Sequence, residues 1–167
     1  MKKVLLSDLK NEHNGNILLS GDVESGKSEQ MKAWIKEVME QTDEAVVFLD
    51  FQSQYAYIVA KKFMRQSRFH SMVLNPNEFD RTVMKFLNVI MELNQYSERR
   101  LNILIDSIDD FYELGVMLDL IVMLKYSRVN NTRIIMTKTT RNVGTHDEKR
   151  TLSCLEEFVE NKLSSNI

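Results

Sequence analysis

Short apolar runs alternate along the chain with longer stretches in which apolar residues recur every three or four positions. The short runs predict buried strands at residues 16–20, 45–50, 70–75, 101–106 and 132–137. The longer stretches predict a helix from residue 27 onward and further helices at 54–66, 78–96, 112–126 and 147–163. Strands and helices that alternate in this way predict an α/β fold, with a mostly parallel sheet of about five strands and helices on both faces.

The length of 167 residues predicts a single domain covering 1–167. The net charge of −2 gives no general attraction to nucleic acid or to an anionic membrane. No apolar run approaches the ~18 residues of a membrane span, and the N-terminal apolar run is too short for a signal peptide. We therefore expect a soluble, cytoplasmic chain. Cys154, the single cysteine, fits a reducing compartment, and we expect it to be a buried apolar residue on a C-terminal helix.

The segment "GDVESGKS", residues 21–28, matches the phosphate-loop pattern G-x-x-x-x-G-K-[ST] in full. It follows a predicted strand and opens a predicted helix, which is the context this motif requires. Its glycines let backbone N–H groups turn toward phosphate oxygens, its lysine supplies a positive charge, and its last hydroxyl suits Mg²⁺. The predicted nucleotide-binding residues are Gly21, Asp22, Val23, Glu24, Ser25, Gly26, Lys27, Ser28 and Glu29.

A carboxylate that orients Mg²⁺ is expected at the end of a buried strand. "LNILIDSIDD" supplies Asp106, and we predict that Ser28 and Asp106 hold the metal, with Asp50 as the competing residue. Many ATPases of this class carry Glu directly after that Asp to polarise water, whereas this chain has Ser107. Asp106 and Asp109 remain candidates for a catalytic carboxylate, but no catalytic residue is assigned. Binding of ATP and Mg²⁺ is therefore better supported than hydrolysis.

Guanine-nucleotide motifs are incomplete, because "DSID" lacks the glycine of D-x-x-G and "TKTT" lacks the final aspartate of [NT]-K-x-D. Instead the chain resembles the FtsK/HerA group of motor ATPases, and especially the FtsK-type domains of the EssC/EccC ATPase of type VII secretion. The resemblance covers roughly residues 15–144 and rests on "NGNILLSGDVESGKS", "VVFLDFQSQY", "LNILIDSIDDFYEL" and "LDLIVMLKYSRVNNTRIIMTKTTRNVG". It implies a RecA/FtsK-like P-loop NTPase fold.

Departures from the group's pattern imply a degenerate member. Ser107 replaces Glu, Thr139 stands near the position of a sensor Gln, and the C-terminal strands of the full motor core are not evident in the sequence. The resemblance then implies a domain of a larger, membrane-associated secretion ATPase, with sister ATPase domains and secreted proteins as partners. Two alternatives stay open: an active FtsK/HerA-type DNA translocase or conjugation ATPase, and an adaptor that uses the fold only for protein contacts. Arg128, Arg133 and Arg141 are candidates for an arginine that reaches a neighbouring subunit.

Overall fold

The computed structural model describes residues 4–9, 15–50, 62–63, 65–73, 81–109, 114–140 and 145–165. A short 3-10 turn, η1 (Leu6–Asp8), precedes the sheet. The strands are β1 (Ile17–Gly21), β2 (Ala45–Asp50), β3 (Phe69–Val73), β4 (Leu101–Asp106), β5 (Thr132–Thr139) and β6 (Asn161–Ser164). The described helices are α1 (Lys27–Gln41), α3 (Arg81–Asn94), α4 (Leu114–Ser127) and α5 (His146–Glu156).

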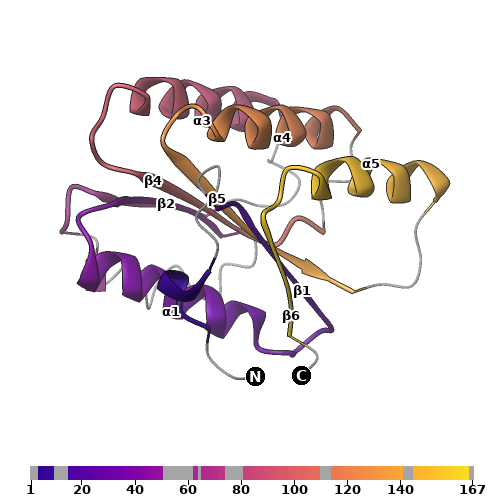
Figure 1. Cartoon of the computed structure of the whole chain (residues 1–167), viewed down its shortest axis with the longest axis horizontal. Helices are drawn as coiled ribbons and strands as arrows, with labels where there is room; N and C mark the ends of the chain where they lie inside the picture. The colour runs from indigo at the N-terminus through magenta and orange to yellow at the C-terminus, as the bar shows by residue number, and fades with distance from the viewer. Residues whose placement is uncertain are drawn as a thin grey trace.

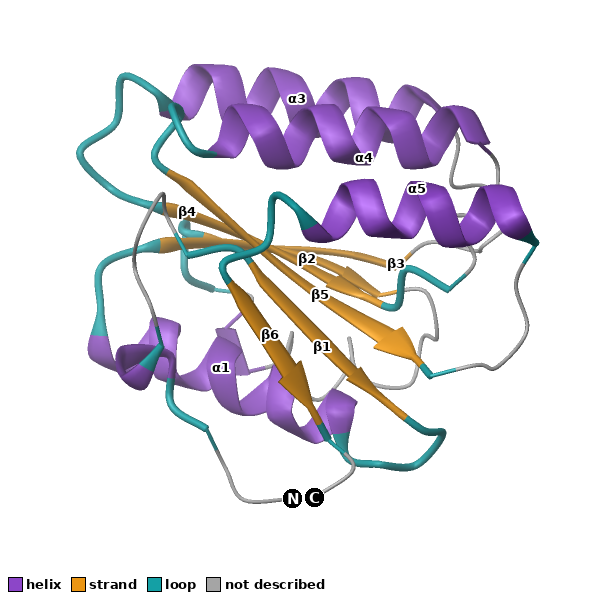
Figure 2. Ribbon diagram, turned by 45° about the vertical axis from the view of Figure 1, so that its right-hand side comes forward, coloured by secondary structure: helices purple, strands orange, loops and turns teal. Residues whose placement is uncertain are grey.

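All six described strands are parallel and lie in the order β3-β2-β4-β5-β1-β6. Helix α1 covers one face of the sheet, and α3, α4 and α5 cover the other (Figures 1 and 2). The sequence prediction of a parallel sheet with helices on both faces is thus confirmed. In such a sheet, ligands bind beyond the carboxyl ends of the strands, and β1 and β4 both deliver their last residues to that edge.

The two faces of the sheet have separate apolar cores because successive strand residues point to opposite sides. In β4, Ile103 and Ile105 join the cluster beneath α3, α4 and α5. Leu104, between them, joins the cluster beneath α1, which also contains the fully buried Trp34. The strand pattern therefore fixes which helices cover which face.

A buried asparagine anchors the start of the strand that leads into the phosphate loop. Asn16 has no exposed surface, and its Oδ1 accepts a hydrogen bond of 2.9 Å from the Ile134 amide. Its Nδ2 donates to Ser127 Oγ at 2.9 Å. A buried side-chain amide whose oxygen and nitrogen are both hydrogen-bonded restricts the neighbouring elements to one arrangement. Asn16 thereby ties β1 to β5 and to the end of α4.

The predicted C-terminal helix at 147–163 is partly wrong, because α5 ends at Glu156 and β6 follows. The sheet consequently has six strands, and one C-terminal strand that the sequence did not reveal is present. The physical reason is that β1 would otherwise leave one side of its backbone unpaired, and β6 pairs with it from Ile17↔Asn161 to Ser20↔Ser164. Tertiary pairing here outweighs the local helical spacing.

Other boundaries differ less. The strand predicted at 70–75 corresponds to β3, and residues 74–75 lie outside the described part of the chain. Most of the helix predicted at 54–66 also lies outside it, although Lys62 and Phe63 are helical. Cys154 is on α5 as predicted but is exposed, because its neighbour Leu155 takes the inward position on that helix. None of the described helices is long and apolar enough to cross a bilayer.

Candidate nucleotide-binding site

The phosphate loop connects the end of β1 to the start of α1, as the sequence predicts (Figure 2). Two of its residues have left-handed backbone conformations, Glu24 with φ 63° and Gly26 with φ 86°. A Cβ atom on Gly26 would meet nothing within 4 Å, so the backbone conformation, not lack of space, calls for glycine there. Alternation of left- and right-handed residues turns successive N–H groups toward one point and forms an anion-binding nest.

The first turn of α1 has N–H groups available for a ligand. Gly26 is the N-cap residue and makes no side-chain capping bond. The first helical N–H groups lack partners within a helix, and the helix dipole places partial positive charge at the same end. A helix start of this kind binds phosphate.

The Lys27 side chain is hydrogen-bonded to the backbone at the start of the phosphate loop. Its Nζ donates to the carbonyl oxygens of Gly21, at 2.8 Å, and of Asp22, at 2.6 Å. An ammonium group has three N–H donors, and the third has only a marginal contact, 3.5 Å to Ser25 Oγ. Lys27 is therefore held beside the loop with a donor to offer to an anion. Burial lowers the pKa of Lys27, and the nearby carboxylates oppose this change.

Asp106 faces the loop from the end of β4. Its Oδ1 accepts a 2.7 Å hydrogen bond from the Thr137 hydroxyl, and its carboxylate also accepts one from the Ser28 hydroxyl. Burial is the main cause that raises the pKa of Asp106, and Asp50, its register partner on β2, adds to the effect. The structure thus brings together the two residues predicted to hold the metal, and it places Asp50 beside them.

The chemistry of these groups fits Mg²⁺. Hydroxyl and carboxylate oxygens are its preferred ligands, and Mg²⁺ usually keeps several waters and takes the rest of its ligands from phosphates. Within the described segments, no group of three or more His, Cys, Asp or Glu side chains could hold a metal. Ser28 and Asp106 would therefore hold Mg²⁺ together with a polyphosphate.

The position after Asp106 has its own hydrogen bonds. The Ser107 hydroxyl donates to Asp109 Oδ2 at 2.6 Å, and both carboxylate oxygens of Asp109 accept from the Thr139 amide at 2.9 Å. Asp109 is only 6% exposed. It therefore lies against β5, beside the strand ends, instead of beyond them in solvent.

Sequence reasoning missed two contributors to this site. Thr137, which bonds Asp106, lies on β5, and nothing in its local sequence marks it as a partner of β4. Ser165, just after β6, places its hydroxyl 2.5 Å from Ser25 Oγ. A Cβ atom on Gly21 would lie only 1.6 Å from Ser165 Oγ, so the C-terminal segment leaves no room for a side chain at Gly21.

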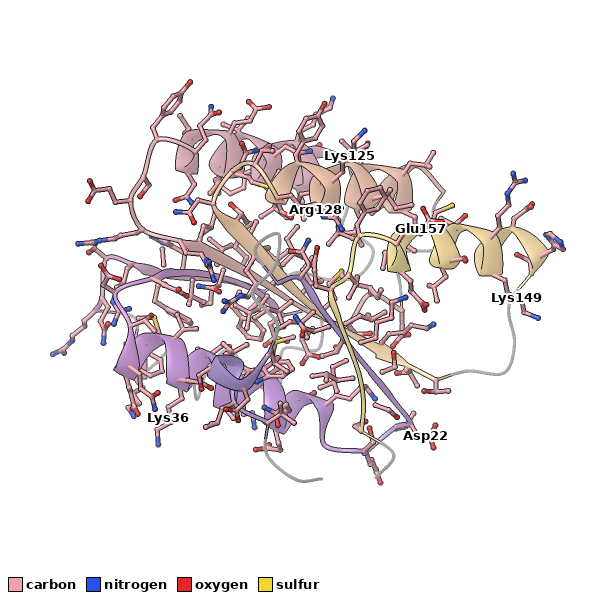
Figure 3. The ribbon with its side chains drawn as sticks, viewed as in Figure 1. Asp22, Lys36, Lys125, Arg128, Lys149 and Glu157 are labelled. Carbon is pink, nitrogen blue, oxygen red and sulfur yellow. The ribbon has the colours of Figure 1, made fainter. Side chains whose placement is uncertain are left out.

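Neither of the two candidate arginines in the described residues, Arg128 and Arg133, lies at the loop. Arg128 forms an ion pair of 3.0 Å with Glu160 and also contacts the Glu157 carbonyl, far from Asp22 at the outer tip of the loop (Figure 3). Arg133 is buried near the start of β5, at the opposite edge of the sheet. Arg141 lies outside the described residues.

No protein-family model matches the sequence, and no curated protein matches it either. Solved structures do match. ATPases 2 and 3 of EccC from Thermomonospora curvata, in complex with a signal sequence peptide, align with a TM-score of 0.70 and 12% identity, over 95% of this chain and 32% of that one. The chain therefore shares its fold with these EccC ATPase domains. The cytoplasmic domain of EssC aligns with a TM-score of 0.64 and 16% identity, over 90% of this chain and 32% of that one.

RecA-like ATPases share the same fold. A KaiC-like protein from Pyrococcus horikoshii OT3 aligns with a TM-score of 0.61 and 15% identity, over 92% of this chain and 71% of that one. The chain thus spans about a third of the EccC and EssC structures it matches.

Proposed function

We propose that this chain is an ATP·Mg²⁺-binding P-loop domain of a type VII secretion-like ATPase, which binds ATP but hydrolyses it weakly or not at all. The observation that carries the proposal is the joint placement of an uncapped helix start, a lysine bridged to the loop carbonyls, and a Ser28 hydroxyl bonded to Asp106. Each element suits one part of a magnesium–nucleotide complex.

The proposed roles follow the geometry. Loop amides from Gly21 to Ser28 surround the phosphates, Lys27 contacts the outer phosphates, and the start of α1 at Glu29 completes the anion site. Ser28 and Asp106 hold Mg²⁺, which supplies positive charge that neutralises the polyphosphate. Weak hydrolysis is proposed because Ser107 is no base, and its hydroxyl already donates to Asp109.

The proposed partners are sister ATPase domains and a secreted protein, with the membrane reached only through a larger assembly. Support comes from one of the similar structures, which holds ATPases 2 and 3 of EccC with a signal sequence peptide. Large apolar side chains that stay exposed on and just after α3 and α4 also suit protein contacts; they are Phe86, Val89, Leu93, Tyr96, Leu118, Val122, Tyr126 and Val129.

The decisive experiment measures binding of a fluorescent ATP analogue and steady-state turnover for the whole chain with Mg²⁺. Lys27→Ala removes a charged donor that contacts phosphate, so the affinity should fall about 100-fold, equivalent to about 2.7 kcal/mol. Lys36→Ala is the matched control, because Lys36 is a solvent-exposed lysine on the same helix (Figure 3). Its affinity should equal that of the wild type.

Two results would overturn the proposal. Equal affinity of the wild type and Lys27→Ala would mean that the loop does not bind the nucleotide, which leaves the adaptor alternative. Rapid turnover that duplex DNA stimulates would favour the DNA translocase or conjugation ATPase instead.

A further inference from the structure

The turn after β4 carries a carboxylate back toward the phosphate loop. Beyond Asp106, the Ile108 amide donates to the Thr137 carbonyl at 2.9 Å, so the chain continues alongside β5 after the strand itself has ended. This path brings Asp109 under the end of β5 and shields most of its surface. A residue two positions later than the expected Glu thus reaches the same edge of the sheet.

Three hydrogen bonds hold this carboxylate. The Thr139 amide donates to both oxygens of Asp109, and the Ser107 hydroxyl donates to Oδ2. The Asp109 amide in turn donates to Ser107 Oγ at 3.1 Å, which fixes the serine rotamer. A carboxylate has about four lone-pair sites, so Oδ1, which accepts only from Thr139 among these groups, can still accept a hydrogen bond from water. These bonds therefore orient the Asp109 carboxylate and still leave it able to accept a further hydrogen bond.

The position of this carboxylate relative to the loop follows from strand register. Thr139 is the register partner of Gly21, the first residue of the loop. The Gly21 carbonyl accepts both from the Thr140 amide, at 2.9 Å, and from Lys27. Asp109 thus lies one strand away from the backbone that holds the lysine. Among the carboxylates that raise the pKa of Lys27, Asp109 has the largest effect.

The other buried carboxylates have different positions. Asp106 is bonded to Ser28 and Thr137 and is the proposed metal ligand. Asp50 has no exposed surface at all. Asp109 has more exposed surface than either of them, at 6%, and its charge acts on Lys27, so it is the one best placed to meet a water molecule beside the outer phosphate.

We propose that Asp109 is the carboxylate that positions and deprotonates the attacking water in whatever ATP hydrolysis this chain performs, and that Ser107 is a positioning residue that holds it. This inference rests on the proposed function. The water oxygen forms a bond to the γ-phosphorus. The bond from that phosphorus to the β,γ-bridging oxygen breaks, and its electron pair leaves with ADP. The water proton passes to Asp109, which returns it to the phosphate product.

The test separates binding from chemistry. Binding of a non-hydrolysable ATP analogue is measured with Mg²⁺, and single-turnover hydrolysis of ATP is followed with the protein in excess. Asp109→Asn keeps the shape and an oxygen acceptor for the Thr139 amide but removes the base. Its single-turnover rate should fall about 100-fold or more, the usual contribution of a general base, with an affinity within about threefold of wild type.

Two further variants test the positioning role of Ser107. Ser107→Ala leaves the Thr139 bond intact, and its rate should fall about fivefold to tenfold at unchanged affinity, as expected for the loss of one charge-assisted hydrogen bond. Ser107→Thr keeps a hydroxyl and should restore most of the rate, which a purely structural defect would not predict. Asp43→Asn, which removes an exposed carboxylate at the other end of the sheet, is the matched charge control and should hydrolyse at the wild-type rate.

The outcomes are distinct. If the wild type fails to bind Mg²⁺ and ATP, the proposed function fails and this inference falls with it. If the wild type binds ATP but Asp109→Asn hydrolyses it within twofold of the wild-type rate, or the wild type shows no hydrolysis of bound ATP, only the inference is overturned. Should Asp109→Asn not fold, judged by circular dichroism, the Ser107→Ala and Ser107→Thr pair decides: equal rates for the two would overturn the inference.

Discussion

The two sides of the candidate site are built in different ways. The phosphate loop is formed by consecutive residues, is largely accessible to solvent, and is stabilised by its own backbone, as in the bonds from Lys27 to Gly21 and Asp22. The acidic side is buried and is assembled from β4 and β5, where Asp106 and Asp109 depend on partners about 30 residues later in the sequence. The phosphate loop is thus formed by residues that are adjacent in sequence, whereas the acidic side is brought together by strand pairing.

This difference affects the electrostatics. Amides and one lysine offer positive charge on the loop side, whereas Asp106, Asp109 and Asp22 all act on that lysine. Carboxylates near a polyphosphate are unfavourable unless a cation lies between them. A divalent cation is therefore what should make the two sides compatible, and the predictions below test them separately.

Removal of Mg²⁺ should have the largest effect. With EDTA present, the carboxylates would repel the polyphosphate without screening, and the affinity for ATP should fall more than about 100-fold, or about 2.7 kcal/mol. Isothermal titration calorimetry with and without Mg²⁺ would measure it. Equal affinity under both conditions would show that the acidic side does not act on the ligand.

Asp106→Asn should weaken Mg²⁺-dependent ATP binding about 10-fold to 100-fold, because a metal-binding carboxylate is lost. In the metal-free protein the same change should raise stability at neutral pH. Burial raises the pKa of Asp106 above its ordinary value of 3.8, so the native state favours the protonated form. The corresponding stability is fully present below that ordinary value and is lost as the pH rises through the raised pKa.

The neutral amide avoids this loss. Urea unfolding in EDTA should therefore find Asp106→Asn more stable than wild type at pH 7.5, with the difference shrinking toward pH 4. A variant that is less stable than wild type at pH 7.5 would show that the hydrogen bonds of the carboxylate outweigh its burial.

Gly21→Ala should destabilise the loop side by about 1–3 kcal/mol, since the new Cβ atom would overlap Ser165 Oγ and crowd Ser25 Oγ. A second substitution, Ser165→Gly, removes the closer obstacle and should recover about half of that loss. Chemical unfolding of both single variants and the double variant gives the coupling between the positions. Strict additivity would contradict the contact between the C-terminal segment and the loop.

Thr137→Val should have the smallest effect. It removes the hydroxyl that donates to Asp106 while preserving shape, and should cost about 1–2 kcal/mol in stability at pH 7.5. Combined with Asp106→Asn, the loss should be smaller, because a neutral acceptor forms a weaker bond. A thermal unfolding series at pH 7.5 measures this, and an unchanged loss in the combined variant would exclude a charge-assisted bond.

The same contrast explains what the sequence could reveal. The loop from Gly21 to Ser28 was predictable because its motif is a run of consecutive residues between a strand and a helix, and the end of β4 at Asp106 was predictable from the apolar positions that precede it. The partnership of Asp109 with Thr139 was not, because it needs the register between β4 and β5. Strand β6 could not be predicted for the same reason, because it is pairing with β1 that stabilises it as a strand.

The position of β1 inside the sheet, next to the edge strand β6, has a mechanical consequence. Because β5 and β6 flank it, the strand that carries the loop is held on both sides, and β6 forms the outer rim with Lys162 facing solvent. Local unfolding of β6 must first break its four-residue pairing with β1 before it can alter the loop. Amide deuterium exchange should accordingly be faster in β6 than in β1, because the edge strand can open while the strand that positions the loop stays paired.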